Sequence, residues 1–220
     1  MNTVDSATTT GYTLKRLNSV RSYFQKEGVD APPISTFLKN KTILRNLLIM
    51  TLVWMVTHYN LILMNFLLAT FDDIWRTAIF SNVSDIIGYI FAGSVVYRFG
   101  IKTTLLLSFV LTSLGAIGVL VVGLENQECA LFFGMIGLTK LGIASSYQII
   151  YISHCQLFPT LFSATAIGWL QFASVLISAL APLQVAISDT QVIPMATMSA
   201  LAAVTALSVC CLKHEHRSEQ

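Results

Sequence analysis

One lysine lies deep inside an apolar stretch of this chain, and its side chain is the one best suited to do chemistry. Lys140 stands well inside the segment 129–153, which is otherwise without charge. A charged side chain at the centre of a membrane costs at least about 2.5 to 3.5 kcal/mol, so it usually faces a partner or a water-filled cavity. We therefore expect Lys140 to contact a bound solute. A structural ion pair with Asp85 is the alternative, and the two roles are compatible.

Aromatic and amide side chains follow Lys140 in the same segment. Tyr147 and Tyr151 return to roughly the side of a helix that carries Lys140, because helical neighbours recur every three to four residues. Gln148 stands beside them, with a contact between neighbouring helices as its alternative role. We expect Lys140, Tyr147, Gln148 and Tyr151 to line a solute-binding surface.

Two more polar positions interrupt apolar stretches. Asp85 lies inside the stretch between residues 76 and 98, where it is a candidate for a cavity role or for pairing with Lys140. Tyr59 and Asn60, next to His58, form a polar patch in the middle of the stretch between residues 45 and 72. Transporter helices often break at such a point to expose their backbone to solute. A helix–helix interface is the alternative.

The composition indicates a membrane protein. The 220 residues are 55% hydrophobic and only 11% charged, whereas soluble domains carry about 25% charged residues. Six apolar stretches follow a polar N-terminal segment, and each exceeds the roughly 20 residues that cross a membrane as a helix. They lie between residues 45 and 72, 76 and 98, and 102 and 125, over about 129–153 and 160–187, and between 189 and 213.

The distribution of charge predicts the orientation of these spans. Most lysines and arginines fall before residue 46, in the turn with Arg98 and Lys102, and in the C-terminal tail, whereas the opposite side holds Arg76 and several acids. Because basic loops stay in the cytoplasm, both termini should be cytoplasmic. We expect a cytoplasmic N-terminal segment at 1–41, an all-α six-helix transmembrane domain at 42–212 and a cytoplasmic tail at 213–220.

A short motif joins the second and third expected spans. Residues 93–102 read GSVVYRFGIK. Gly93 would let two helices approach closely, and Gly100 would supply the backbone freedom of a tight turn. Arg98 and Lys102 would anchor that turn. The segment resembles the G-x-x-x-D-R-x-G-R-K loop signature of the major facilitator superfamily.

A longer stretch extends this resemblance. Residues 139–163, TKLGIASSYQIIYISHCQLFPTLFS, resemble the tenth helix and following loop of the organic cation/anion transporter branch, with its G-K-x-G-I and A-E-L-[FY]-P-T-x-x-R patterns. The resemblance covers about 38–212 and implies the C-terminal half of a twelve-helix transporter, built as a three-plus-three inverted repeat. Pro159 should fix the turn, Thr160 should cap the next helix, and Pro182 should kink it.

The chain departs from the family pattern at charged positions. Tyr97 stands where the loop signature has an acid, and Ile101 where it has an arginine. Gln156 and Ser163 replace a glutamate and an arginine expected to pair, and Val175 stands where the branch often reads substrate charge. Substrate charge is therefore not inferred from position 175. The altered positions fit either a divergent substrate or a chain relaxed from transport.

The resemblance implies transport of small organic ions or solutes by alternating access. One six-helix bundle is half of such a transporter, so a second bundle is expected. It would come from a second copy of the chain in a homodimer or from a separate N-terminal half. The third explanation for the half-size chain is a truncated gene product. The runner-up is a non-transporting interaction or regulatory subunit, and a channel is weaker. The sequence holds no enzymatic signature or metal-ligand spacing. We expect no enzyme activity, cofactor, metal or nucleic acid, and a protein of the lipid bilayer, by family the plasma membrane.

Overall fold

The structure is a computed structural model that describes residues 41–71, 74–122, 130–158, 160–188 and 190–212. All of them belong to one compact unit, Asn40–Gln220. A second unit, Met1–Lys39, lies outside the described residues, as does the tail from residue 213. The expected cytoplasmic segments at both ends of the chain are therefore not described, apart from Lys41.

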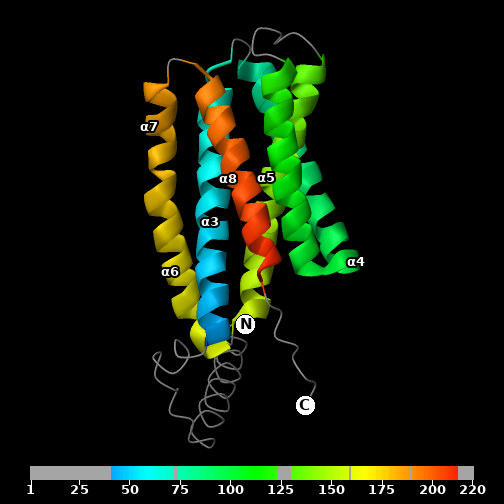
Figure 1. The fold of residues 1–220 in the computed structure, drawn as a ribbon. Helices are drawn as coiled ribbons and strands as arrows, with labels where there is room; N and C mark the ends of the chain where they lie inside the picture. The colour runs from blue at the N-terminus through cyan, green and yellow to red at the C-terminus, as the bar shows by residue number, and fades with distance from the viewer. Residues whose placement is uncertain (1–40, 72–73, 123–129, 159, 189, 213–220) are drawn as a thin grey trace, which may run out of the picture. The chain divides into compact units, whose positions relative to one another are not determined.

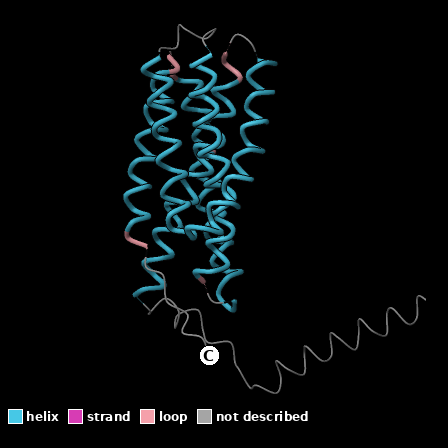
Figure 2. Tube along the Cα trace, turned by 90° about the vertical axis from the view of Figure 1, so that its right-hand side faces the viewer, coloured by secondary structure: helices cyan, strands magenta, loops and turns pink. Residues whose placement is uncertain are grey.

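The described residues form α-helices joined by short connections (Figures 1 and 2). In chain order the helices are α3 (Lys41–Leu68), α4 (Ile74–Val122), α5 (Ala130–Leu157), α6 (Thr160–Ser178), α7 (Leu180–Ile187) and α8 (Val192–Cys210). Five stretches within them are long and apolar enough to cross a membrane: Lys41–Leu68, Thr77–Val122, Ala130–Leu157, Ser163–Ile187 and Val192–Cys210. The expected all-α class is confirmed for the described residues, and their long apolar helices indicate a membrane-embedded protein.

The second and third expected spans form the single element α4, which is interrupted at Gly100. Gly100 has φ 78° and ψ 173°, outside the helical region, and among the described residues it alone has a positive φ. A side chain would strain that conformation, which glycine adopts freely. Gly100 therefore supplies the backbone freedom expected of the turn, and it divides α4 into a first arm (74–99) and a second arm (101–122).

The first arm runs parallel to α5. Phe80 lies against Gly137, and Gly88 lies against Ala144, so residue numbers rise together along the two helices. Ser145 also donates a hydrogen bond of 3.0 Å to the Gly88 carbonyl oxygen.

The second arm runs antiparallel to α5. Gly118 lies against Met135, and Thr112 lies against Gly142, so residue numbers run in opposite directions. The two arms are therefore antiparallel to each other, and Figure 1 shows α4 turning back at its lower end. These contacts involve glycine, whose side chain is a single hydrogen atom, so the backbones of α4 and α5 can approach closely.

Within the described residues, no helix makes the close approach expected at Gly93. A Cβ added at Gly93 would meet nothing within 4 Å, because this side of α4 is exposed. The glycines that do hold helices together face α5 from α4 or face α4 from α5: Gly88, Gly115, Gly118, Gly137 and Gly142.

The helix formed by α6 and α7 is interrupted near Pro182. Pro182 has no backbone N–H, so the carbonyl of Ser178, four residues earlier, lacks its helical partner. The assigned break falls there, with α6 ending at Ser178 and α7 beginning at Leu180. Ala179 keeps helical angles, φ −62° and ψ −19°, so the two pieces continue in nearly one direction.

Candidate solute-binding site

Lys140 is buried and paired. Its side chain is 2% exposed, and its Nζ lies 3.4 Å from Asp85 Oδ2 on the first arm of α4. The same Nζ donates a shorter hydrogen bond, 2.7 Å, to Asn65 Oδ1 on α3. The ion pair offered as the alternative for Lys140 is thus present. Three helices meet at this ammonium, and Asn65 is a member that the sequence analysis missed.

Asp85 keeps part of its hydrogen-bonding capacity unused. Its Oδ1 is buried and, within the described residues, has no hydrogen-bond partner, whereas Oδ2 faces Lys140. The Asp85 side chain is 21% exposed. Asn65, the other partner of Lys140, is exposed. A solute could therefore reach Asn65 and Asp85 directly, but it could reach Lys140 only by displacing one of these two partners.

The two tyrosines lie together on the same side of α5. The Tyr147 and Tyr151 hydroxyl oxygens are 3.3 Å apart, and Tyr151 Oη accepts a hydrogen bond of 3.0 Å from Gln171 Nε2 on α6. Tyr147 packs on His58, and Tyr151 meets Trp54 edge-on with ring centroids 4.8 Å apart. Lys140 also contacts α3, through Asn65. Lys140, Tyr147 and Tyr151, which were expected on one side of α5, therefore all contact α3.

Tyr59 belongs to a different place in the bundle. Its hydroxyl donates to Gln184 Oε1 on α7, and Gln184 Nε2 donates over 2.7 Å to Thr197 Oγ1 on α8. Because helical neighbours are rotated by about 100°, Tyr59 points away from His58. The break considered for this patch is absent, since α3 is helical throughout Lys41–Leu68, and Tyr59 instead lies at a helix–helix interface, the alternative role.

Asn60 and Gln148 also stand apart from the ion pair. Asn60 is 1% exposed, and both of its side-chain polar atoms are buried without a hydrogen-bond partner in the described part of the chain. Gln148 is exposed on α5, beside Tyr147.

A histidine joins the end of α5 to α6. His154 Nε2 lies 2.8 Å from Ser163 Oγ and 3.0 Å from the Ser163 carbonyl oxygen. Since a carbonyl oxygen only accepts, Nε2 carries the proton that bonds to it. Gln156 is exposed and lines a hollow at this end of the bundle. Pro159 and the side chain of Thr160 lie outside the described residues.

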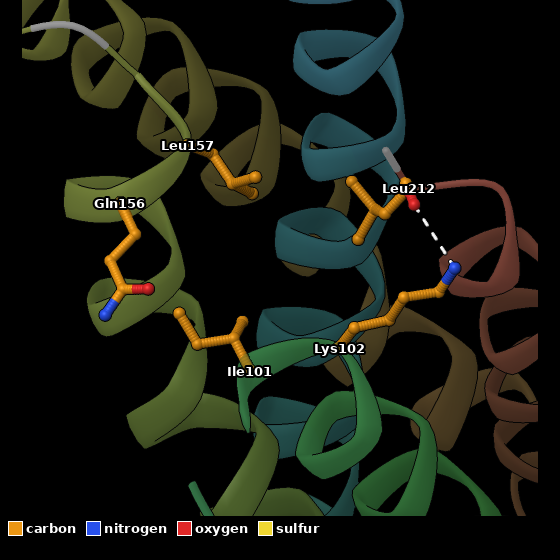
Figure 3. A pocket seen from close by; sticks show the side chains of 5 residues that line it. All are labelled: Ile101, Lys102, Gln156, Leu157 and Leu212. Atoms are coloured by element: carbon orange, nitrogen blue, oxygen red, sulfur yellow. Dashed lines mark hydrogen bonds between the residues drawn. The ribbon is translucent and has the colours of Figure 1, made fainter. Parts of the chain in front are cut away.

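The turn at Gly100 is tied to the end of α8. Lys102 Nζ donates to the carbonyl oxygens of Cys210, over 2.6 Å, and Leu212, over 3.2 Å. Figure 3 shows Lys102 reaching Leu212 beside Ile101, Gln156 and Leu157, which line the hollow with them. A cation suits the carbonyl end of a helix, so Lys102 anchors the turn as expected. Arg98 is exposed.

Replacing Lys102 with methionine is expected to lower the free energy of unfolding by about 0.5 to 1 kcal/mol, because α8 loses a cation at its carbonyl end. Amide hydrogen exchange in residues 209–212 should become faster. Lys102→Arg, which keeps a donor and a charge, should retain most of the protection. Equal exchange in both variants and the unchanged protein would show that this contact does not hold the end of α8.

Two hollows lie at the two ends of the bundle, away from Lys140. One is the hollow of Figure 3, and the other lies where α3, α7 and α8 meet. The second is lined by Leu67, Thr70, Val185, Ser188, Thr190, Gln191 and Pro194. No residue expected to contact solute lines either of these two hollows.

Searches against protein-family models and against curated proteins found no match for this chain.

Proposed function

We propose that this chain is half of a transporter that moves small organic solutes across a membrane by alternating access. A polar strip supports the proposal. It consists of Asn65 on α3, Asp85 and Tyr89 on α4, Tyr147 and Tyr151 on α5, and Gln171 on α6, each exposed or half-buried.

The polar strip lies within helices that are apolar enough to span a membrane. Lipid tails offer no hydrogen bonds, so polar side chains at membrane depth normally face protein or a water-filled cavity. Two of these residues hold Lys140, and three are joined through the Tyr151 hydroxyl. A strip of this kind is suited to form one wall of a solute cavity, with phenol, amide and carboxylate groups available to the solute.

The packing order supports the proposed three-plus-three inverted repeat. α3 packs on α6 and α7, which run parallel to it, and α5 packs on the first arm of α4, which is parallel to α5. Contacts between α3 and α4, and between α5 and α6, are sparse. The first three spans are α3 and the two arms of α4, and the last three are α5, α6 with α7, and α8. The first helix of each group of three therefore packs on the other group, as expected of an interlocked repeat. Counting the arms of α4 separately gives six spans.

The described chain begins and ends at one end of the bundle, which supports an even number of spans. α3 and α5 are antiparallel, because Trp54 meets Tyr151 whereas Phe71, later in the chain, meets Phe132, which is earlier in α5. The start of α3 thus lies with the Gly100 turn, the end of α5 and the end of α8. The basic residues Lys41, Arg45, Arg98 and Lys102 gather there, which favours placing this end in the cytoplasm.

Uptake into liposomes that contain only this chain tests the proposal. Benzoate serves as an organic anion and tetraethylammonium as an organic cation. Native mass spectrometry of the same sample reports whether two copies assemble. We expect dimers, and uptake of at least one probe above that of protein-free liposomes. If no uptake occurs although dimers form, the proposal of a self-sufficient half-transporter is overturned.

Tyr147→Phe is expected to lower uptake by about tenfold, because a site that hydrogen-bonds its solute loses one partner. Tyr97→Phe is the matched control: it makes the same change at a residue that is 93% exposed at the Gly100 turn. Unchanged uptake in Tyr147→Phe, or an equal loss in both variants, would contradict a solute-binding role for the polar strip.

A non-transporting membrane subunit is the second candidate. The observation in its favour is that Lys140, the strongest candidate residue, is buried and already paired. Its side chain is 2% exposed and bonds both Asp85 and Asn65. This candidate predicts membrane insertion without uptake of either probe. It also predicts that folded Lys140 variants keep every partner interaction of the unchanged chain.

A further inference from the structure

Three neighbouring residues on α3 carry polar atoms that are buried without partners. These atoms are Nε1 of Trp54, Oγ1 of Thr57, and Nδ2 and Oδ1 of Asn60; none of them has a hydrogen-bond partner in the described part of the chain. The three residues are 0%, 1% and 1% exposed, respectively. Thr57 and Asn60 are three positions apart, so they lie on one side of the helix.

Five threonine hydroxyls elsewhere in this bundle are satisfied by their own helix. Thr51, Thr104, Thr112, Thr139 and Thr205 each donate to the carbonyl oxygen four residues earlier. Asn82 does the same with its amide. Thr57 has the carbonyl of Val53 at this spacing but makes no such bond. Its hydroxyl and the Asn60 amide are therefore placed for partners other than their own helix.

Bound water does not supply those partners in this conformation. Each of the four atoms has virtually no accessible surface, and a buried water needs space beside the polar atoms that it bonds. Unpaired polar groups cost free energy, the more so in the interior of a membrane protein. A conformation in which the same atoms reach water or a polar solute would remove this cost.

We propose that this structure is a sealed state of the bundle, and that in a second state α3 moves so that Thr57 and Asn60 face an aqueous cavity. The partner that fits them is water or an uncharged polar group, such as a solute hydroxyl or amide. The atoms include the donors Nδ2 and Nε1 as well as acceptors, and a metal cation would leave the donors unpaired. The proposal does not depend on transport, because it concerns only the two conformations of this chain.

Cysteine accessibility tests the second state. Thr57→Cys and Asn60→Cys are made in a chain whose four cysteines, at positions 129, 155, 210 and 211, are serine. The protein in liposomes is treated with a charged methanethiosulfonate reagent, and labelling is followed by intact mass. Met64→Cys is the matched control, since Met64 lies on the same side of α3 and is 0% exposed but apolar.

We expect Thr57→Cys to be labelled at least about tenfold faster than Met64→Cys, because local opening reaches this position selectively. Asn60→Cys lacks the amide that favours opening, so it should be labelled more slowly than Thr57→Cys but still faster than Met64→Cys. Equal rates at the three positions would overturn the proposal, since they would report general unfolding or no opening. Labelling without any solute uptake would instead overturn the proposed transport and leave this inference standing.

A second variant tests the cause of the motion. Asn60→Leu removes the unpaired amide while keeping a similar volume, so it should favour the sealed state. In the Thr57→Cys chain, Asn60→Leu is expected to slow labelling by about fivefold through this shift in population. An unchanged rate would show that the Asn60 amide does not drive the opening, and would overturn the proposal.

Discussion

Replacing Lys140 with methionine is expected to lower the free energy of unfolding by about 3 kcal/mol, because it leaves the Asp85 carboxylate in the bundle without its counter-ion. The lower end of the usual range applies, since the Asp85 side chain is 21% exposed and keeps some contact with solvent. The change also removes the 2.7 Å hydrogen bond to Asn65, whose exposed amide can turn to water. Chemical unfolding in detergent, followed by circular dichroism, measures the loss.

The double variant Lys140→Met, Asp85→Leu separates the two contributions. It removes both charges, and replacing a buried pair by apolar side chains is often neutral or stabilising. We therefore expect the double variant to recover most of the stability that Lys140→Met loses. If the double variant were less stable than Lys140→Met, the ion pair would not be the reason that Lys140 matters. Asp85→Asn should lower the free energy of unfolding by less than Lys140→Met does. Lys140 keeps its bond to Asn65, and an amide oxygen takes the place of the carboxylate oxygen as its second acceptor.

The fold class followed from the sequence because it depends on properties that add up along the chain. Apolar length and scarce charge predicted helices able to span a membrane. The turn followed from one residue, since Gly100 is needed where φ is positive. The ion pair could also be predicted from the sequence, because a lysine and an aspartate, each in an apolar span, have few other partners.

The remaining contacts depend on helix rotation, which the sequence does not fix. His58 and Tyr59 are adjacent in the chain, yet one packs on Tyr147 of α5 and the other bonds Gln184 of α7. Asn65 gave no signal because asparagine is common near helix ends, and only packing brings it to Lys140. His154 was missed in the same way, because only packing brings its imidazole from α5 to Ser163 on α6.

The glycines show the same limit, because the chain alone did not reveal which glycine lies at a helix contact. Gly93 stood in a family-like motif, yet a Cβ there would meet open space. Gly142 follows Lys140 closely in the chain and is pressed against the second arm of α4. A Cβ on Gly142 would lie 2.6 Å from the Thr112 backbone nitrogen and 2.7 Å from the Ser108 carbonyl oxygen.

Gly142→Ala is therefore expected to lower the free energy of unfolding by about 2 to 3 kcal/mol, or to prevent folding, because two of the three nearest obstructing atoms are backbone and α4 must move away as a whole. Gly93→Ala, the same change in an open helical position, should raise stability by up to about 1 kcal/mol through helix propensity. Thermal unfolding of both variants in one detergent gives the comparison. The opposite signs distinguish packing from propensity. A loss at both sites would mean that Gly93 of α4 is as crowded as Gly142 of α5, and a gain at both would mean that α4 and α5 are not in close contact.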